Sequence, residues 1–587
     1  MQMEWRVRER DPDAAEALVR ELMLSPLFAD ILVSRGFREH AQARKHLQAR
    51  LTDIEEPTTL KDMARASARL AAAIRAGEAI LVYGDYDVDG MSGTALLLNF
   101  LRGCGADASF YIPNRLKEGY SFNEEAIASI LSRERPPTVV ITVDHGISAV
   151  EGIARLAAAG VDVIVTDHHE PPGVLPTAAH ALVNPRQKDC PSLAKNLCGA
   201  AVAFKLAWAT AVALDGTRRV NDTFREFLVE ATCLVAIATI ADVIPLEGES
   251  RVICRHGLQA LNGRSHAGLK SLLNVAKLGD EKNVTARQVA FQVGPRLNAA
   301  GRLGMAEMAI ELLTTRDVVR AAELSASLDA ANERRRAIER EMIEEMHQHE
   351  DVLSADGSAG ICLGARHWHP GVIGIAAARI AERCKVPVMI CALNGHEGRG
   401  SARSRGGVNL AVLIHELLPL VVSGGGHSGA AGCTITEDQF PAFREAFIAR
   451  SRELLRLAPP EELQVDAEAR FAQLGPNLVR ELESLAPHGA GNPIARFVIR
   501  NCHVVGPPRR VGRDASTLQF LLREGDEVRR AVGFGMGARL PELMRAQPID
   551  VVTELAFDDY RGDSEIQLRV LDFKPARGSA SPSASPS

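Results

Sequence analysis

AILVYGDYDVDG, residues 79–90, decides the fold class, because a short apolar run here meets three closely spaced aspartates. AILVY (79–83) is typical of a buried strand, and the apolar residues from Gly93 to Leu101 recur at the spacing of a helix. A strand, an acidic loop and a helix in this order form the repeating unit of a parallel α/β sheet. We therefore expect an α/β domain in this part of the chain.

Four more strand-like runs, rich in apolar and β-branched residues, follow at the intervals that such a sheet requires. They cover residues 108–112, 138–143, 161–166 and 181–183. Ser121 to Glu124 has the pattern of a capping box and predicts the start of a helix between two of these strands. Two apolar helices are expected after the last strand, around 199–214 and 224–240.

The rest of the chain shows three further patterns. Residues 305–350 are dense in Ala, Glu and Arg without Gly or Pro, which predicts long helices that connect two domains. A second α/β pattern starts near residue 359, and short strand-like runs with turn residues after 465 predict a small β-barrel. The expected domains are a helical N-terminal extension (1–70), an α/β domain (71–250), a helical connector (251–355), a second α/β domain (356–455), the barrel (465–575) and a disordered tail (576–587).

Composition excludes several classes of protein. The 587 residues carry 68 Lys and Arg against 74 Asp and Glu, a net charge of −6, which argues against a polycation that coats nucleic acid indiscriminately. The ten cysteines are scattered without a C-x-x-C pair, so a reducing compartment fits best. The opening residues lack the apolar core of a signal peptide, and the apolar run 233–241 is too short to span a membrane. We expect a cytoplasmic protein with no membrane partner.

Asp85, Asp87 and Asp89 follow the first predicted strand at alternate positions. Three such carboxylates repel one another unless a cation lies among them. An EF-hand loop is excluded, because its twelfth position would be Leu96 instead of Glu and a strand precedes it. A solvated acidic turn remains the alternative for this loop taken alone.

Other strand ends carry the same kinds of side chain. One strand ends in Asp144-His145, another ends in Asp167-His168-His169, and Asp242 follows an apolar helix, where it could also be a simple helix-end residue. Because the carboxyl ends of parallel strands converge on one crevice, we expect these groups to lie together. Carboxylates with some imidazole suit Mn²⁺ or Mg²⁺. Two ions that share a carboxylate would activate a water and clamp a phosphoryl group.

Four segments of the chain resemble the motifs of the DHH phosphoesterases. They are Tyr-Gly-Asp-Tyr-Asp-Val-Asp-Gly (83–90), Val-Asp-His-Gly (143–146), Thr-Asp-His-His (166–169) and Ala-Asp-Val-Ile-Pro-Leu (241–246). The residues of these motifs are similar to those of the RecJ branch, the bacterial exonucleases that degrade single strands 5′→3′. The resemblance runs from about residue 20 to residue 575. It implies a DHH catalytic domain, a DHHA1-like phosphate-binding domain and an OB-like barrel for the three folded domains predicted above.

The resemblance also implies two ions, Mn²⁺ or Mg²⁺, that share the bridging carboxylate of Asp144. One ion would be held by Asp87 and Asp144 with Asp85 close by, and the other by Asp89, Asp144, His168 and Asp242. The catalytic residues would be Asp87, Asp89, Asp144, His168, His169 and Asp242. His169 would face the scissile phosphate instead of binding a metal.

Two Gly-rich segments, 398–404 and 424–432, predict an anion site, because glycine turns expose backbone N–H groups and arginine binds phosphate. No Lys-Ser/Thr follows the glycines, which excludes a Walker loop, and flexible turns remain the alternative. By resemblance, the terminal phosphate would bind Ser401, Arg403, Gly424, Gly425, Gly426 and His427, and the strand near the cut would bind Arg115, Asn298 and Arg302. Ser121 stands where the family usually has Gly.

Local charge agrees with a nucleic-acid ligand. Residues 366–405 carry seven Lys and Arg against two Glu, and residues 495–540 carry nine Arg against four acidic residues, a net charge of +5 in each segment. Such patches could equally be solvated surface. On a barrel they would suit a groove that follows a single strand.

The leading hypothesis is therefore an enzyme that degrades single-stranded DNA from its 5′ end to 5′-mononucleotides and acts in DNA repair and recombination. Candidate protein partners are a single-strand-binding protein and a helicase. A DHH phosphodiesterase for short oligonucleotides or cyclic dinucleotides is the first alternative, although it would not need the barrel. A non-catalytic replication scaffold is the second, although every expected metal ligand is present.

Overall fold

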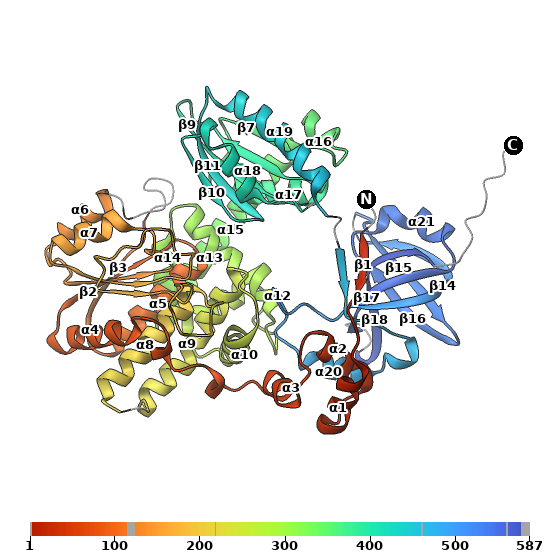
Figure 1. Ribbon diagram of the computed structural model, residues 1–587, viewed down its shortest axis with the longest axis horizontal. Helices are drawn as coiled ribbons and strands as arrows, with labels where there is room; N and C mark the ends of the chain where they lie inside the picture. Colours follow the sequence, from red (N-terminus) through yellow and green to blue (C-terminus); the bar gives the residue numbers. More distant parts are fainter. Residues whose placement is uncertain are drawn as a thin grey trace. The chain divides into compact units, whose positions relative to one another are not determined.

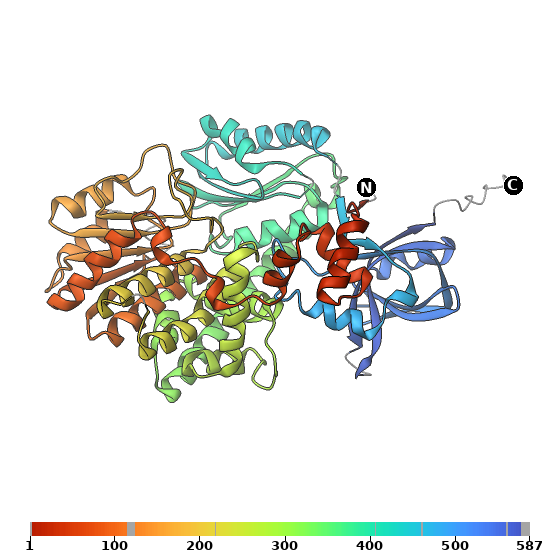
Figure 2. The same cartoon turned by 60° about the horizontal axis from the view of Figure 1, so that its bottom comes forward.

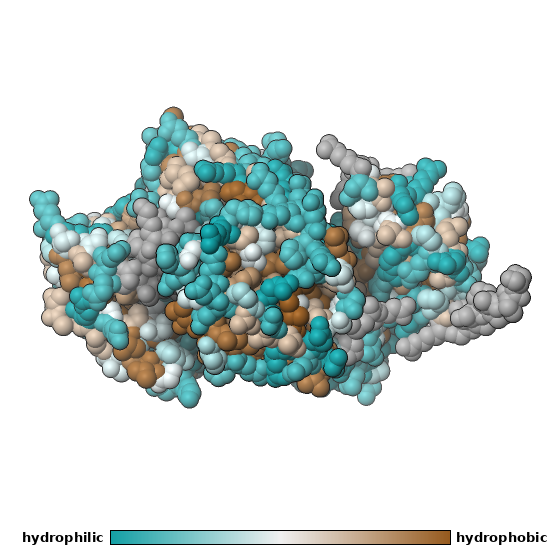
Figure 3. Space-filling model, turned by 90° about the horizontal axis from the view of Figure 1, so that it is seen from above, coloured by the Kyte–Doolittle hydropathy of each residue, from teal (hydrophilic) through white to brown (hydrophobic). Residues whose placement is uncertain are grey.

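The computed structural model describes residues 3–113, 122, 124–217, 219–405, 407–459, 462–512, 514–558 and 562–576. They form two compact units, Leu51–Glu461 and Met1–Arg50 with Glu462–Ser587. No helix in the described part of the chain has the length and hydropathy needed to span a membrane. On the face seen in Figure 3, hydrophobic residues form small patches between hydrophilic ones.

The first sheet of the larger unit is parallel, as predicted, and all five expected strands are present. Its strands are β2 (Ala79–Gly84), β3 (Asp107–Tyr111), β4 (Val139–Val143), β5 (Asp162–Thr166) and β6 (Ala181–Val183). They lie in the order β3-β2-β4-β5-β6. The direction in which successive strands are added therefore reverses between β2 and β4, and ligands bind at such a switch point in open α/β sheets.

Helices cover both faces of this sheet (Figure 1). They are α4 (Met63–Ala76), α5 (Val88–Gly103), α6 (Glu124–Leu131), α7 (Val150–Ala158) and α8 (Gly199–Asp215). The helices α6 and α7 pack on the face that presents Leu81, Val140 and Val163, and α4, α5 and α8 pack together on the other. The predicted helix at 124 is confirmed, whereas Ser121 and Arg115 lie outside the described residues.

Helix α5 begins earlier than the sequence suggests. We expected the helix from Gly93, but it starts at Val88, directly after Asp87. Asp87 caps it by accepting hydrogen bonds from the backbone N–H groups of Asp89 (2.9 Å) and Gly90 (3.1 Å). The expected acidic loop is therefore partly the first turn of a helix, and Asp89 lies inside it.

Helices fill the chain between the first and second sheets. They are α9 (Asp222–Ala241), which lies within the limits predicted for the first α/β domain, α10 (Gly248–Gly263), which crosses the end of that domain, and the helices of the connector, α11 (Ala267–Val275), α12 (Ala286–Gln288), η3 (Val289–Val293), α13 (Gly294–Arg302), α14 (Ala306–Thr314), α15 (Val318–His347) and α16 (Glu350–Leu353). The predicted long helix is thus α15, with 30 residues. Between α12 and α13 the chain forms one π-helical turn, η3.

The second α/β domain has a mixed sheet in the order β10-β11-β9-β8-β7. Its elements are β7 (Ile361–Ala365), α17 (Ile373–Cys384), β8 (Val388–Ala392), β9 (Glu397–Arg403), α18 (Leu410–Glu416), β10 (Ser423–Gly426), β11 (Ala430–Thr436) and α19 (Phe440–Leu457). Helix α17 and the end of α15 pack on one face, and α18 and α19 cover the other (Figure 2). Trp368 is buried in the first of these cores.

The smaller unit is built around the predicted barrel. Its elements are β1 (Glu4–Val7), α1 (Pro12–Leu22), α2 (Pro26–Ser34), α3 (His40–Leu47), β12 (Glu462–Val465), β13 (Ala467–Glu468), α20 (Pro476–Glu483), β14 (Phe497–Val511), β15 (Thr517–Glu524), β16 (Glu527–Gly533), α21 (Leu540–Arg545), β17 (Ile549–Asp558) and β18 (Gly562–Pro575). Pairing of β14 with β17 closes the barrel. Strand β1 pairs with β12, and the buried side chains of Arg35 and Asp466 form a bidentate ion pair. The N-terminal segment therefore belongs to the same core as the barrel.

Candidate metal centre and phosphate-binding cavity

A group of acidic and imidazole side chains lies at the switch point of the parallel sheet. Asp85 follows β2, Asp144 follows β4, and the segment 167–169 follows β5. Asp242 caps the end of α9 and also lies in this group. The two alternatives that the sequence offered for Asp242 are therefore both correct. The convergence of strand ends that the sequence predicted is therefore present.

Asp89 is held in place by the first turn of α8. Its carboxylate accepts hydrogen bonds from the backbone N–H groups of Gly199 and Ala200, both at 2.7 Å, at the first turn of α8. The positive end of that helix stabilises a nearby carboxylate. A Cβ atom at Gly199 would lie 2.5 Å from the Cβ of Asp144, so only glycine allows this close approach.

The side chains form three sets in which one oxygen or nitrogen atom from each residue lies within 4.8 Å of the others. The sets are Asp85, Asp87 and Asp144; Asp89, His168 and Asp242; and Asp144, His168 and His169. The Nε2 atom of His168 is 3.0 Å from Asp144 Oδ1 and 3.7 Å from both Asp89 and Asp242. Asp144 and His168 each belong to two sets, so they join the sets into one centre.

The charged form of the carboxylates in this centre is energetically unfavourable without a cation. Burial, followed by the charge of Asp87, raises the pKa of Asp89 to about 6. Burial and the charges of Asp89 and Asp87 raise the pKa of Asp242 to about 8, and burial with four neighbouring carboxylates raises the pKa of Asp144 well above its usual range. Asp144 Oδ1 is buried and accepts no hydrogen bond within the described part of the chain. Oxygen-rich donors of this kind fit Mn²⁺ or Mg²⁺.

The two histidines have opposite electrostatic characters. Burial lowers the pKa of His168 to about 4, which leaves a neutral imidazole that can bind a metal. Burial also disfavours a charge on His169, but its hydrogen bond with Asp167, 2.8 Å from Nδ1 to Oδ1, raises its pKa to about 9. His169 is therefore a cation at neutral pH, and Asp167 orients it.

His145, the other imidazole at a strand end, does not join this centre. Its Nε2 atom lies 3.2 Å from the carbonyl oxygen of Tyr83, and its ring packs against the Tyr83 ring. It belongs to none of the three sets found among the described residues.

A cavity of about 440 Å³ adjoins the carboxylates. Asp85, Asp87 and Asp242 line it together with Tyr86, Ala241 and Val243. Asn298 and Arg302 of the connector line it too, with Arg403 and Ala430 of the second α/β domain. One cavity thus presents carboxylates that can hold metals and arginines that can bind phosphate.

Ser401 and Arg403 lie two residues apart on β9, and Arg403 Nη1 donates to Ser401 Oγ at 3.2 Å. A Cβ atom at Gly374, in the first turn of α17, would lie 2.9 Å from that hydroxyl oxygen, so the helix start approaches this pair closely. Arg302 Nη1 in turn donates to the carbonyl oxygen of Gly371, just before α17, at 2.9 Å. These contacts bring the expected phosphate-binding residues of two domains together.

The second Gly-rich segment differs from our expectation. We predicted an anion-binding turn, but Gly424, Gly425 and Gly426 form strand β10, which pairs with β11. His427 follows it, and its N–H donates to the carbonyl oxygen of Ala430 at 2.8 Å. Pairing with β11 explains the difference, because Gly in this segment allows an extended edge strand as readily as a turn. None of these four residues is among the described residues that line the 440 Å³ cavity.

Three residues that contribute to the site carry no clear signal in the sequence. Gly199 and Ala200 position Asp89, and Tyr86 lines the cavity. The signal that could have found Gly199 is a glycine at the start of a long apolar helix pattern, where close packing against another element is common.

Three known domain families match separate parts of the chain. The DHH family, N-terminal domain, matches residues 79–238, the DHHA1 domain matches 358–453, and the RecJ OB domain matches 465–572. These matches cover the parallel sheet domain, the mixed sheet domain and the barrel.

The chain is similar to known proteins over nearly its whole length. It is 34% identical to the single-stranded-DNA-specific exonuclease RecJ of Bacillus subtilis, over 97% of this chain and 70% of that protein. It is 31% identical to the protein of the same name from Dickeya dadantii, over 96% and 97%. The crystal structure of Thermus thermophilus RecJ in complex with Mn²⁺ matches 97% of this chain and 79% of that one, with a TM-score of 0.82 and 31% identity. The chain therefore belongs to the RecJ family of DHH phosphoesterases.

Proposed function

We propose that the protein is a single-stranded-DNA-specific exonuclease that degrades its substrate 5′→3′ and releases 5′-mononucleotides by two-metal hydrolysis. The observation that carries this proposal is the 440 Å³ cavity, in which Asp85, Asp87 and Asp242 share one space with Arg302 and Arg403. A phosphodiester in this cavity could touch metals and arginines at once. The activity that the relatives' names state supports the same reaction and substrate.

In this proposal the metal ligands are Asp85, Asp87, Asp89, Asp144, His168 and Asp242. Divalent cations, when bound, activate water for attack and neutralise charge on a phosphoryl group. Asp144 belongs to two of the three sets and is the candidate bridging ligand. His169, kept protonated by Asp167, would donate a hydrogen bond to the scissile phosphate.

Substrate polarity would come from a pocket that accepts one end of the strand. Ser401 and Arg403 would bind the 5′-phosphate, with Asn298 and Arg302 beside the next phosphodiester. Gly424–Gly426 and His427 remain candidates for this pocket from the sequence resemblance alone, as does Arg115. We also propose that arginines of the barrel, including Arg509, Arg523 and Arg530, contact the phosphates of the strand.

The proposed biological setting is DNA repair and recombination in the cytoplasm, with a single-strand-binding protein and a helicase as partners. All ten cysteines are free thiols, which suits a reducing compartment. We also propose the domain limits given above, with the DHH domain over 71–250, the DHHA1-like domain over 356–455 and the OB-like barrel over 465–575. The residues matched by the three domain families support these limits.

The test is a cleavage assay with Mn²⁺ on a long single strand that is labelled at its 5′ end, with the matching duplex as control. The proposal expects labelled mononucleotide as the first product and little cleavage of the duplex. Cleavage of dinucleotides but not of the long strand would instead favour a short-oligonucleotide phosphodiesterase. Strand binding without any cleavage would favour a scaffold.

A further inference from the structure

The backbone of His169 is held at both ends by buried side chains. Its N–H donates to Asp167 Oδ1 at 3.0 Å, and its ring Nδ1 lies 2.8 Å from the same oxygen. Its carbonyl oxygen accepts from Asn184 Nδ2 at 2.9 Å. Asp167 directly follows β5 and Asn184 directly follows β6, the strand beside it. His169 is therefore clamped between the ends of two neighbouring strands.

The amide group of Asn184 is fixed in one orientation by the chemistry of its partners. Its Oδ1 atom accepts from the backbone N–H of Arg186 at 2.7 Å, which closes a turn of the Asx type. Its Nδ2 atom faces the carbonyl oxygen of His169, which can only accept, so the nitrogen side of the amide belongs there. Asn184 is completely buried, so water does not compete for either contact.

The two clamps on His169 have different effects. Asp167 fixes the ring, whereas Asn184 fixes the main chain from which the ring extends. Because Nδ1 faces the buried Asp167, Nε2 is the ring nitrogen left for a substrate, and the side chain is 37% exposed. A displacement of about 1 Å at a reacting group can cost about 100-fold in rate. The position of the His169 carbonyl therefore matters for any contact that its ring makes.

An ion pair also joins the two segments that carry these residues, but it lies at the surface. Arg186 Nη1 donates to Glu170 Oε1 at 2.8 Å, and the two side chains are 28% and 66% exposed. Ion pairs in contact with water stabilise a structure only weakly. The buried contact of Asn184 is therefore the one that holds residues 167–170 against residues 184–187.

We propose that Asn184 is a positioning residue for the hydrolysis, which places the His169 imidazole at the scissile phosphate by holding the His169 carbonyl oxygen. The inference rests on the proposed function, since that function gives His169 its contact with the substrate. Asn184 belongs to none of the three ligand sets found among the described residues, and it is not among those that line the 440 Å³ cavity. It acts through His169 and leaves metal binding to other residues.

The test compares Asn184→Ala with Gln187→Ala in the full chain. Gln187 is the matched control, because it is a buried amide of the same segment and its Nε2 donates to the carbonyl oxygen of Leu182 at 2.7 Å. Both variants should lower Tm. Only Asn184→Ala should lower kcat for Mn²⁺-dependent cleavage of a 5′-phosphorylated single strand, by about 10- to 100-fold. Its KM, and its Mn²⁺ affinity in calorimetry, should stay near the wild-type values. Equal kcat values in the two variants would overturn the proposal.

Asn184→Ser decides the matter if Asn184→Ala fails to fold. The serine hydroxyl can still accept from the N–H of Arg186, but the shorter side chain no longer reaches the His169 carbonyl oxygen. The same fall in kcat is expected, and a wild-type kcat in Asn184→Ser would overturn the proposal. The proposed function fails on a different result, namely if the wild type does not cleave single strands in Mn²⁺.

Discussion

The carboxylate of Asp89 is fixed by the backbone N–H of Gly199, at 2.7 Å, across two helices that are far apart in the sequence. This contact needs glycine, because a Cβ atom at Gly199 would lie 2.5 Å from the Cβ of Asp144 and 2.8 Å from its Cα. The start of α8 therefore sets the position of two candidate metal ligands at once. Backbone geometry, and not only the acidic motifs, shapes the centre.

Gly199→Ala should weaken metal binding without unfolding the protein. The added methyl group displaces Asp144 or the start of α8, and groups that orient ligands affect metal affinity by about 10- to 100-fold. Titration calorimetry with Mn²⁺ measures this affinity. Gly263→Ala is the control, because a Cβ atom there meets nothing within 4 Å. Unchanged Mn²⁺ affinity in Gly199→Ala would show that the contact is unimportant for the centre.

Asp242→Asn should stabilise the metal-free protein, increasingly so as the pH rises. The pKa of Asp242 is raised to about 8 in the fold, so its ionisation opposes folding, and stability is lost as pH rises from the unfolded pKa of about 4 toward 8. Asn cannot ionise and avoids this loss. In EDTA, the Tm advantage of the variant over the wild type should be near zero at about pH 4 and about 2 °C or more at about pH 8.

The control for this pH series is Asp280→Asn, which removes an exposed carboxylate from the same unit. At about pH 8 the Tm advantage of Asp242→Asn over the wild type should exceed that of Asp280→Asn. Equal advantages of the two variants across the pH range would contradict the raised pKa of Asp242. Saturating Mn²⁺ should reverse the order, because the wild type then gains a ligand that the variant lacks.

Arg403→Ala should erase the preference for a 5′-phosphate. A charge-assisted hydrogen bond contributes about 1.5–3 kcal/mol, so a strand with a 5′-hydroxyl should be cut about tenfold or more slowly by the wild type. The ratio of the two cleavage rates should approach one in Arg403→Ala and remain at the wild-type value in Arg399→Ala, which alters another arginine of β9. If Arg403→Ala slows both substrates equally, Arg403 contacts the backbone generally and does not read the terminus.

Removing the smaller unit should weaken binding to long strands but spare short ones. The deletion must take residues 1–50 as well as 462–587, because Leu18, Phe28 and Ile31 are buried against the barrel and would otherwise be exposed. The remaining fragment, 51–461, keeps every proposed metal ligand. Its affinity for a long strand should fall and its salt slope should decrease by about 0.7 for each lost phosphate contact, as measured by anisotropy. Equal affinity for long strands would give the barrel another role.

The sequence predicted the parallel sheet well, because each strand is a run of β-branched or apolar residues that ends in a polar loop. It also predicted which strand ends converge, since that follows from the parallel topology. It misplaced the start of α5, because Asp87, Asp89 and Gly90 read as a loop by composition, whereas the Asp87 side chain caps the helix. The composition of residues 424–426, all glycine, likewise predicted a turn, whereas pairing with β11 makes this segment a strand.

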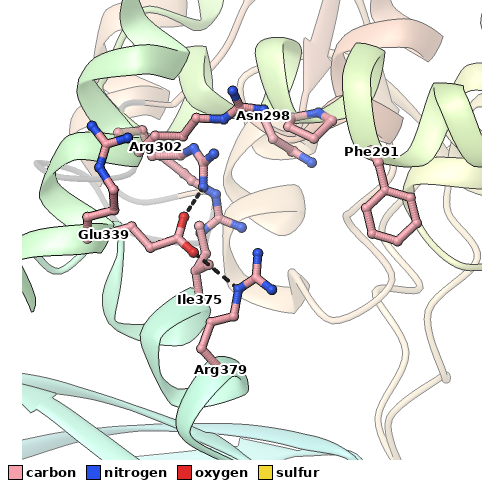
Figure 4. A pocket seen from close by; sticks show the side chains of 10 residues that line it. Phe291, Asn298, Arg302, Glu339, Ile375 and Arg379 are labelled. Atoms are coloured by element: carbon pink, nitrogen blue, oxygen red, sulfur yellow. Dashed lines mark hydrogen bonds and ion pairs between the residues drawn. The ribbon is translucent and has the colours of Figure 1, made fainter. Parts of the chain in front are cut away.

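The cavity lined by Arg335, Glu339 and Arg379 (Figure 4) could not be predicted from the sequence, because these residues come from helices that meet only in the fold. Arg335 and Glu339 look like an ordinary ion pair one helical turn apart on a solvated helix. Only the packing of α17 against α15 brings Arg379 to the same carboxylate. Sequence patterns report local periodicity, so sites that depend on contacts between distant helices escape them.

The most direct test of the whole account is the rate of Mn²⁺-dependent cleavage of a 5′-phosphorylated single strand by the wild type and by Asp144→Asn. Asp144 joins two of the three ligand sets, and Asn keeps its size while removing its charge. We expect a loss of about 10³-fold or more in rate, with unchanged strand binding and an unchanged fold. Wild-type rates in Asp144→Asn would contradict it, because the hydrolysis would then not depend on the carboxylate at the centre of the site.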